Sequence, residues 1–370
     1  MPAISIMMKP ASGLCNMRCE YCFYNDETSK RETTSYGMMT LETLEQIIKK
    51  TLSYAEDYCS ILFQGGEPTL AGLDFYKAVI DFEQKWNVNH VTIENSIQTN
   101  GLLIDDEWAQ FLNQNHFLVG LSLDGTQELH DCCRKDQLLN GTFQQVMHTV
   151  ELFRKYHVEF NILTVVTKHT IPHTKELYAF FKKMGFEWQQ YIPCLNPLDE
   201  HDVCYDYSLT SEDYGIFLKD LFDCWYEEAR CGHLRYVRYF IGLMNLLCRR
   251  APGACEMNGV CSRQFVIEAD GSIFPCDFYM LDEWRLGNFA TDSFETIEQR
   301  REELQFIQAS ETLSPACTDC HWVYLCRGGC RRDRLPGEND TLGQNRHCAA
   351  FQEFFSYAYP RLVEIVKLYS

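Results

Sequence analysis

CNMRCEYC, residues 15–22, places three cysteines at the spacing C-x3-C-x2-C. The stretch directly follows an apolar run, residues 4–9, that predicts a first β-strand. Three thiolates supply three ligands of a four-iron cluster and leave one iron without a protein ligand, which is the open position a catalytic metal site needs. Structural zinc is the alternative reading, but zinc needs a fourth protein ligand. His90 and His116 stand at no motif spacing from these cysteines.

The first 200 residues alternate short apolar runs with longer amphipathic segments. Further strands are predicted over 60–64, 90–98, 118–123, 158–166 and 186–194, and helices over 41–56, 72–86, 105–114, 142–156 and 173–184. Six strands with a helix after each of the first five predict a parallel α/β fold. A complete eight-unit barrel takes about 250 residues, so two architectures remain, an open partial barrel and a doubly wound sheet. In both, the chemistry gathers at the carboxyl ends of the strands.

The pattern changes after a long helix predicted over 210–230, which the sequence TSED at 210–213 introduces as a capping box. A β-hairpin is predicted from two runs, 263–267 and 272–276, that are joined through Asp270-Gly271. Loop-rich, cysteine-rich sequence follows, and a last helix is predicted over 348–368. We therefore expect two domains, residues 1–232 and 233–370.

Composition narrows the class of protein. The chain has 33 basic and 52 acidic residues and a net charge of −19, so the basic face of a nucleic-acid-binding protein is not expected. No apolar run approaches the roughly 18 residues of a membrane helix, and no secretory signal is evident, so we expect a cytoplasmic protein without a membrane partner. Nineteen cysteines in that reducing compartment indicate metal or cluster ligation rather than disulfides.

Eight cysteines form a second pattern in the C-terminal third. Cys261-x9-Gly271-x4-Cys276 spans the predicted hairpin and is followed by the remaining members, Cys317-x2-Cys320-x5-Cys326-x3-Cys330 and Cys348, with Cys255 as an eighth thiol upstream. Eight thiolates would fully ligate two four-iron clusters, which would carry electrons rather than bind substrate. Two zinc ribbons are the rival interpretation, because C-x2-C pairs also fit zinc.

Together with Gly65-Gly66-Glu67-Pro68 after the second strand, the first cysteine motif resembles the radical S-adenosylmethionine (SAM) enzymes, and the second pattern resembles their SPASM extension. Nearly end to end, the chain resembles the anaerobic sulfatase-maturating enzymes; the matching stretches are 9–12, 63–72, 98–101 and 275–279. The resemblance implies a partial (β/α)6 TIM-like radical SAM barrel over 1–232 and a SPASM domain over 233–370.

The resemblance also implies the cofactors, S-adenosylmethionine and three [4Fe-4S] clusters. Cys15, Cys19 and Cys22 would hold the first cluster, whose open iron the cofactor chelates. The other eight cysteines would divide into a first auxiliary set, Cys255, Cys261, Cys276 and Cys330, and a second auxiliary set, Cys317, Cys320, Cys326 and Cys348. The implied contacts to S-adenosylmethionine are Tyr21, Gly66, Ser122, Arg134 and Leu195. The carbonyls of Gly65 and Gly66 could accept from its ammonium, and the charge of Glu67 suits the same cation.

The implied reaction is the oxidation of one cysteine or serine in a sulfatase motif C/S-x-P/A-x-R to Cα-formylglycine. A 5′-deoxyadenosyl radical removes a hydrogen, a base takes the thiol or hydroxyl proton, and an auxiliary cluster takes the electron. Asp277, next to Cys276, matches the family's base, and Tyr24 and Gln64 are candidate substrate contacts. The implied partners are an unfolded or nascent sulfatase chain and a reduced flavodoxin or ferredoxin.

Two alternatives stay open at this point. A SPASM enzyme that crosslinks or epimerises a ribosomal peptide would use the same scaffold; many carry an N-terminal peptide-binding domain, which we do not expect here because fourteen residues precede Cys15. A noncatalytic electron-transfer protein with three clusters would leave the GGEP motif and the three-cysteine site unexplained.

Overall fold

The computed structural model describes residues 3–198, 200, 203–337 and 341–369. By its internal contacts the chain divides into two compact units, each built from several segments. The first unit comprises Met1–Leu123, His130–Asn161 and Arg263–Leu304; the second comprises Asp124–Leu129, Ile162–Ser262 and Gln305–Ser370. The domain boundary expected at residue 232 stays a prediction.

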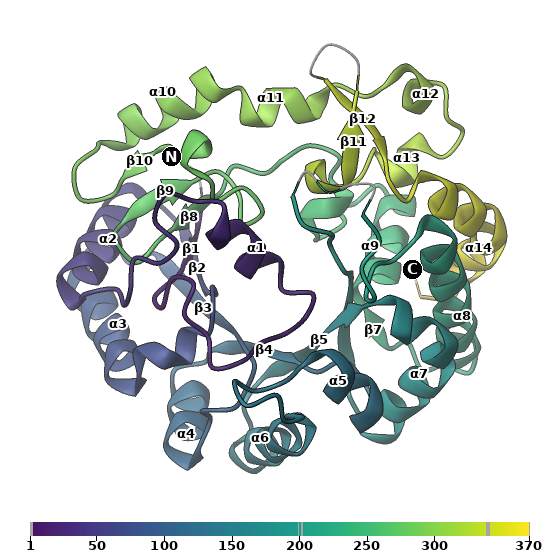
Figure 1. Ribbon diagram of the computed structural model, residues 1–370, viewed down its shortest axis with the longest axis horizontal. Helices are drawn as coiled ribbons and strands as arrows, with labels where there is room; N and C mark the ends of the chain where they lie inside the picture. Colours follow the sequence, from purple (N-terminus) through teal and green to yellow (C-terminus); the bar gives the residue numbers. More distant parts are fainter. Residues whose placement is uncertain (1–2, 199, 201–202, 338–340, 370) are drawn as a thin grey trace. The chain divides into compact units, whose positions relative to one another are not determined.

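Parallel strands form the centre of the first unit (Figure 1). The strand order is β10-β9-β8-β1-β2-β3-β4, with β1 (Ile4–Met8), β2 (Tyr58–Phe63), β3 (Thr92–Thr99), β4 (Leu118–Ser122), β8 (Phe265–Ile267), β9 (Ser272–Phe274) and β10 (Gly287–Asn288). Only β9 runs against its neighbours β8 and β10 in this order, and the pairs from β8 to β4 are parallel. Ile6 of β1 pairs in register with Ile61 of β2 and with Phe265 of β8. The C-terminal hairpin therefore extends the N-terminal sheet, and β8 lies directly beside β1.

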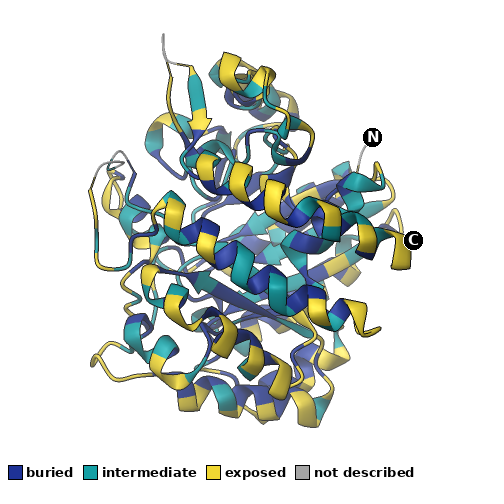
Figure 2. Ribbon diagram, turned by 90° about the vertical axis from the view of Figure 1, so that its right-hand side faces the viewer, coloured by how far each residue is buried: buried dark blue, intermediate teal, exposed yellow. Residues whose placement is uncertain are grey.

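Helices of the first unit are α1 (Phe23–Ser29), α2 (Leu41–Tyr54), α3 (Leu73–Trp86), α4 (Asp106–Gln114), α6 (Phe143–Tyr156) and α10 (Phe294–Leu304). Local chemistry fixes several of their ends. Thr40 caps α2 by accepting from the Thr43 amide, and Asp105 caps α4 by accepting from the Trp108 amide. Most of these helices turn apolar residues inward and polar residues outward, although α1 buries Glu27 and α3 buries Glu83. Figure 2 shows a similar division into buried and exposed faces on the helices nearest the viewer.

The second unit contains most of β5 (Phe160–Val166), followed in its parallel sheet by β6 (Trp188–Pro193) and β7 (Tyr236–Val237). Its helices are α7 (Thr174–Lys183), α8 (Ser211–Arg230), α9 (Arg238–Leu247), α11 (Phe306–Glu311), α12 (Pro315–Thr318), α13 (Val323–Cys326) and α14 (Cys348–Tyr369), and its antiparallel pair is β11 (Arg334–Pro336) with β12 (Leu342–Asn345). Aromatic packing joins α8, α9 and α14 through Phe222, Phe240 and Phe354.

The predicted elements are confirmed closely. All six strands and five helices of the first 200 residues appear within about two residues of their predicted limits, and the Thr210–Asp213 capping box begins α8 as expected. Short helices α1, α5 (Gln127–Cys133) and α9, and the longer α10, were not predicted. Among the described residues no helix has the length and apolar character needed to cross a membrane.

A buried carboxyl in the first unit has no charged partner among the residues that the structure describes. Glu83 of α3 contacts the Asn95 amide of β3, whose nitrogen donates to both carboxyl oxygens at 3.0 and 3.1 Å. Burial raises the pKa of Glu83 to about 7. Asn95 Oδ1 is buried without a hydrogen-bond partner among the described residues, so a protonated Glu83 has an acceptor at hand.

Because the folded-state pKa of Glu83 lies above its ordinary 4.5, the folded chain binds a proton that the unfolded chain releases. Stability is lost as pH rises from about 4.5 through 7, by about 3 kcal/mol in total. We predict that Glu83→Gln raises the melting temperature at pH 8 and changes it little at pH 5. Thermal unfolding under anaerobic conditions measures this, with exposed Glu42→Gln as the control; equal effects at both pH values would contradict it.

Candidate functional site

The three-cysteine loop runs from the end of β1 to the start of α1, all within the first unit. Cys22 is the N-cap residue of α1, and its amide donates to the Cys19 carbonyl at 3.2 Å. Burial raises the pKa of Cys15 to about 12, and the nearby charges of Cys19, Cys22 and Glu67 add to the rise. The thiols that the spacing predicted as cluster ligands are therefore neighbours in space.

The GGEP turn packs against the backbone that leads into this loop. The Gly66 amide donates to the Ser12 carbonyl, and the Glu67 amide donates to the Leu14 carbonyl, both at 2.8 Å. A Cβ at Gly66 would lie 1.9 Å from the Leu14 carbonyl oxygen, so only glycine fits. The glycines thus fix the cysteine loop onto the end of β2.

Glu67 has a role that the sequence did not indicate. Its carboxylate is fully buried and accepts hydrogen bonds from the Thr69 amide and hydroxyl, the Thr99 hydroxyl and the Asn100 amide, at 2.6–3.0 Å. Burial raises its pKa while these bonds oppose the rise. Because these groups of the fold already surround the carboxylate, Glu67 joins the ends of β2 and β3, and the expectation that it meets a cofactor ammonium is not supported.

Asn100, directly after β3, holds the cysteine loop from the other side. Its amide nitrogen donates to Asn16 Oδ1 at 2.7 Å and lies 3.9 Å from Cys15 Sγ. The segment after α5 also pairs with the loop, because the Arg18 amide donates to the Lys135 carbonyl at 2.8 Å. The sequence places Asn100 just after a predicted strand, where functional residues gather, but it does not indicate that Asn100 holds the cysteine loop.

Two predicted cofactor contacts meet beside the cysteines. Arg134 donates to the Tyr21 hydroxyl at 2.9 Å, and both side chains are buried. Gly66 lies against the same loop, and Ser122 ends β4 in the same unit. Leu195 belongs to the second unit. The structure thus brings Tyr21, Gly66 and Arg134 to the cysteine loop.

Asp277 lies in the first unit, three residues beyond the end of β9. Its Oδ1 forms an ion pair with the Nζ of Lys9, whose side chain is 1% exposed. Lys9 directly follows β1, and its amide donates to the Ile267 carbonyl of β8 at 2.8 Å. The neighbouring Phe278 packs edge-on against Phe23, the first residue of α1, with ring centroids 4.8 Å apart. Asp277 is therefore fixed next to the segment that follows Cys22.

Tyr24 lies over this ion pair and is itself anchored. Its ring centroid is 4.6 Å from Lys9 Nζ, and its hydroxyl donates to Glu268 Oε1 at 2.6 Å. Arg31 donates to the same oxygen at 2.6 Å, and both charged side chains are fully buried. Burial and the Glu268 charge raise the pKa of Tyr24 well above its ordinary value, so the phenol stays protonated.

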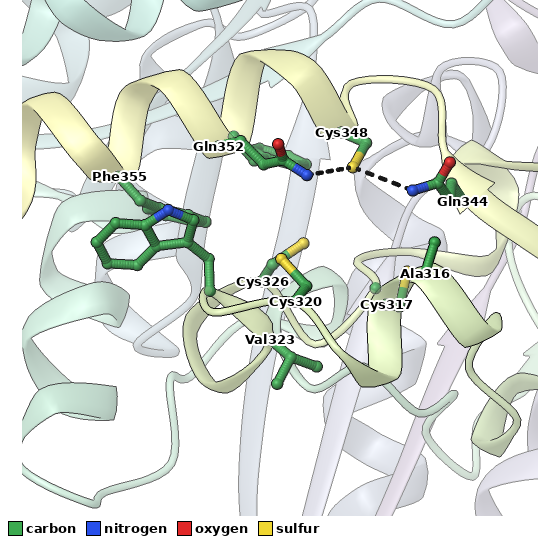
Figure 3. A pocket seen from close by; sticks show the side chains of 12 residues that line it. Ala316, Cys317, Cys320, Val323, Cys326, Gln344, Cys348, Gln352 and Phe355 are labelled. Carbon is green, nitrogen blue, oxygen red and sulfur yellow. Dashed lines mark hydrogen bonds between the residues drawn. The ribbon is translucent and has the colours of Figure 1, made fainter.

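The second auxiliary set gathers in one pocket of the second unit (Figure 3). Cys317, Cys320, Cys326 and Cys348 line it together with apolar side chains, which are Val323, Phe351, Phe355 and Trp322. Gln344 and Gln352 direct their amide nitrogens at Cys348 Sγ, 3.7 and 3.5 Å away. Four converging thiols in an apolar pocket fit a fully ligated cluster.

Three members of the first auxiliary set also lie together. Charges on Cys255 and Cys261 raise the pKa of the buried Cys330 beyond the effect of burial alone, which places the three thiols near one another. The fourth member, Cys276, follows β9 in the first unit. In the second auxiliary set, burial raises the pKa of Cys326 to about 11. Assembly of a cluster must therefore displace thiol protons.

Family models match both parts of the chain. The radical SAM superfamily matches residues 10–181, and the SPASM iron-sulfur cluster-binding domain matches residues 255–321. The first range covers Cys15, Cys19 and Cys22, and the second begins at Cys255. Iron–sulfur clusters, rather than zinc, are thus the metal centres of this fold, with S-adenosylmethionine as the cofactor of the radical SAM domain.

Individual relatives match this chain over nearly its full length. A cysteine-type anaerobic sulfatase-maturating enzyme of Clostridium perfringens is 47% identical over 99% of both chains. A serine-type enzyme of Bacteroides thetaiotaomicron is 29% identical over 96% of this chain and 89% of its own. The solved structure of native anSMEcpe with bound AdoMet and Cp18Cys peptide superposes with a TM-score of 0.95 at 46% identity and covers all of both chains.

The α/β fold with a radical SAM domain and a SPASM domain is confirmed by these matches, and the peptide-bound relative has the kind of polypeptide substrate that was expected. The 47% identity over the full length favours sulfatase maturation over modification of a ribosomal peptide or electron transfer alone. The chain therefore belongs to the anaerobic sulfatase-maturating enzymes, which are radical S-adenosylmethionine oxidoreductases with a SPASM domain.

Proposed function

We propose that this chain oxidises the cysteine of a C-x-P/A-x-R motif in an unfolded or nascent sulfatase to Cα-formylglycine, with Asp277 as the base. The observation that carries the proposal is the buried Lys9–Asp277 ion pair beside the start of α1, because it fixes a carboxylate next to the three-cysteine loop. The choice of cysteine over serine follows the relatives, since the cysteine-type enzyme is 47% identical and the serine-type enzyme 29%.

The residues predicted to contact S-adenosylmethionine have separate roles. When bound at the cluster of Cys15, Cys19 and Cys22, S-adenosylmethionine supplies the radical that removes a hydrogen from the target Cβ. Arg134 and Ser122 hold the cofactor carboxylate, and Tyr21 contacts its adenine. Gly66 allows close approach of its backbone, and Leu195 adds an apolar contact. These five roles follow from the family resemblance, and the contact between Arg134 and Tyr21 beside the cysteine loop supports two of them.

Asp277 takes the thiol proton of the target residue, and water then hydrolyses the resulting thioaldehyde to the aldehyde with release of hydrogen sulfide. Its Oδ1 contacts Lys9, while no donor among the described residues contacts Oδ2, so that oxygen is free to accept. Lys9 orients the carboxylate and is itself fixed by the Tyr24 ring and the Ile267 carbonyl. Because Asp277 follows Cys276, a ligand of the first auxiliary cluster, proton and electron leave the substrate at adjacent residues. Gln64, directly after β2, and Tyr24 contact the substrate peptide.

The remaining partners follow from the same scheme. We propose two auxiliary [4Fe-4S] clusters held by the first and second auxiliary sets, and a reduced flavodoxin or ferredoxin as the electron donor for the radical cluster. A nascent sulfatase as substrate places the enzyme in the cytoplasm. Neither nucleic acid nor a membrane takes part.

The function is tested by anaerobic incubation of the reconstituted enzyme with S-adenosylmethionine, reductant and a peptide containing C-x-P-x-R. Mass spectrometry should show conversion of the cysteine to formylglycine with one 5′-deoxyadenosine formed per turnover. A matched peptide with serine at the target position should react more slowly. A crosslinked or epimerised peptide, or faster conversion of the serine peptide, would contradict the proposal.

Iron content tests the assignment of the cysteines. Three complete clusters correspond to roughly twelve irons per chain, so replacing Cys15, Cys19 and Cys22 by alanine should leave about eight. Cleavage of S-adenosylmethionine should be abolished in this variant because the open iron is lost. Iron near zero with stoichiometric zinc in anaerobically prepared protein would overturn the cluster assignment.

Replacement of Asp277 by asparagine tests the base. The change is nearly isosteric and removes no ligand, so we predict unchanged iron content and continued 5′-deoxyadenosine formation. Formylglycine should fall roughly 100- to 10,000-fold, the usual cost of losing a positioned base. Asp270→Asn is a matched control, because among the described residues the Asp270 carboxylate accepts hydrogen bonds only from Ser272, within the hairpin turn. Near wild-type aldehyde formation by Asp277→Asn would place the base elsewhere.

A further inference from the structure

Arg334 is a buried cation in the second unit that the reaction scheme above does not use. It begins β11 and is 5% exposed. No carboxylate pairs with it among the residues that the structure describes, although an unpaired buried charge is costly. The buried charge of Arg334 must therefore be stabilised by other polar groups.

Backbone carbonyls supply part of that compensation, and they come from the loops that carry the auxiliary cysteines. Arg334 Nη2 donates to the Gly259 carbonyl at 2.6 Å, two residues before Cys261, and Nε donates to the Gly328 carbonyl at 3.2 Å, between Cys326 and Cys330. Nη1 donates to the Ser310 carbonyl at 2.8 Å. Further contacts reach the carbonyls of Arg327, Gly329 and Thr312 at 3.3–3.4 Å.

Glycine is required for this close packing. Gly259, Gly328 and Gly329 all have positive φ, of 76°, 84° and 69°. A Cβ at Gly328 would lie 2.8 Å from Arg334 Nη2, and a Cβ at Gly259 would lie 2.4 Å from the Arg327 carbonyl oxygen. The loops are therefore shaped so that their carbonyls face one guanidinium.

Cysteine thiols from both auxiliary sets lie close enough to Arg334 for their charges to act on it. Burial lowers the pKa of Arg334, and negative charge on Cys261, Cys317, Cys330 and Cys326 opposes that effect. Cys261 and Cys330 belong to the first auxiliary set, whereas Cys317 and Cys326 belong to the second. Thiolates of a loaded enzyme would thus supply the negative charge that Arg334 lacks.

We propose that Arg334 is the shared counter-cation of the two auxiliary clusters and raises the reduction potentials of both. Each reduction adds one electron and one negative charge, with no bond made or broken, and a nearby buried cation stabilises the more negative state. Arg334 thereby favours uptake of the substrate's electron. This proposal rests on the ligand sets of the proposed function.

The test uses redox titration of the auxiliary clusters by electron paramagnetic resonance in the full chain with Cys15, Cys19 and Cys22 replaced by alanine. Iron content and the spectrum first show whether the auxiliary clusters are present, which tests the ligand sets separately from Arg334. Arg334→Gln should then shift the auxiliary midpoint potentials to more negative values. Arg334→Lys keeps the charge and should stay near the parent value.

Arg235→Gln is the matched control, because Arg235 is also buried in the second unit but pairs with Glu228 and Glu187 rather than with the cluster loops. It should leave the potentials unchanged. Unchanged potentials in Arg334→Gln would overturn the proposal. If Arg334→Gln loses auxiliary iron, the Arg334→Lys variant decides between the two roles of Arg334. Clusters retained at the parent potential in Arg334→Lys would support the proposed role of the positive charge. An equal loss of iron in Arg334→Lys would overturn it, because only the forked hydrogen bonds of the guanidinium would then matter.

Discussion

The buried contact between Lys9 and Asp277 is the constraint on which the active site depends. Lys9 leaves β1 just before the cysteine loop, and Asp277 leaves β9 just after Cys276, so the pair joins the two segments that bear the chemistry. Burying two charges costs desolvation energy, and removing one partner of such a pair typically costs 3–5 kcal/mol. The sheet order explains how they meet, because β8 pairs directly with β1 and brings the hairpin to the cysteine loop.

Three buried cations of the chain share one feature, which is a neighbouring group that is or becomes anionic. The chain carries a net charge of −19, yet its buried cations lie beside groups that are, or become, anionic. Lys9 contacts Asp277, Arg31 contacts Glu268, and Arg334 lies near thiols of both auxiliary sets. Glycine turns at Gly66 and Gly328 allow the close backbone approach that these arrangements need. Net charge thus says little about these three buried sites, where each cation lies beside an anionic or ionisable group.

Much of the fold could be predicted from the sequence. Strand and helix periodicity gave the parallel units. The division of the eight cysteines into two auxiliary sets came from the family resemblance, because spacing alone does not group Cys348 with Cys326, 22 residues earlier. Long-range contacts could not be predicted in this way. The paired residues of β8 and β1 lie more than 250 positions apart in the sequence. No sequence pattern near Lys9 or Asp277 indicates that the two side chains touch. Likewise, nothing in the GGEP motif indicates that the Glu67 carboxylate joins the ends of β2 and β3 by accepting from Thr99 and Asn100.

The central claim is that Lys9 holds Asp277 where it can take the proton of the target residue. The most direct measurement is the yield of formylglycine per 5′-deoxyadenosine in Lys9→Met, with Lys9→Arg as the charge-retaining variant. At unchanged iron content, the account predicts that this ratio falls roughly tenfold or more in Lys9→Met, because a displaced base couples poorly to hydrogen abstraction, and that Lys9→Arg restores part of it. A wild-type ratio in Lys9→Met would contradict the account.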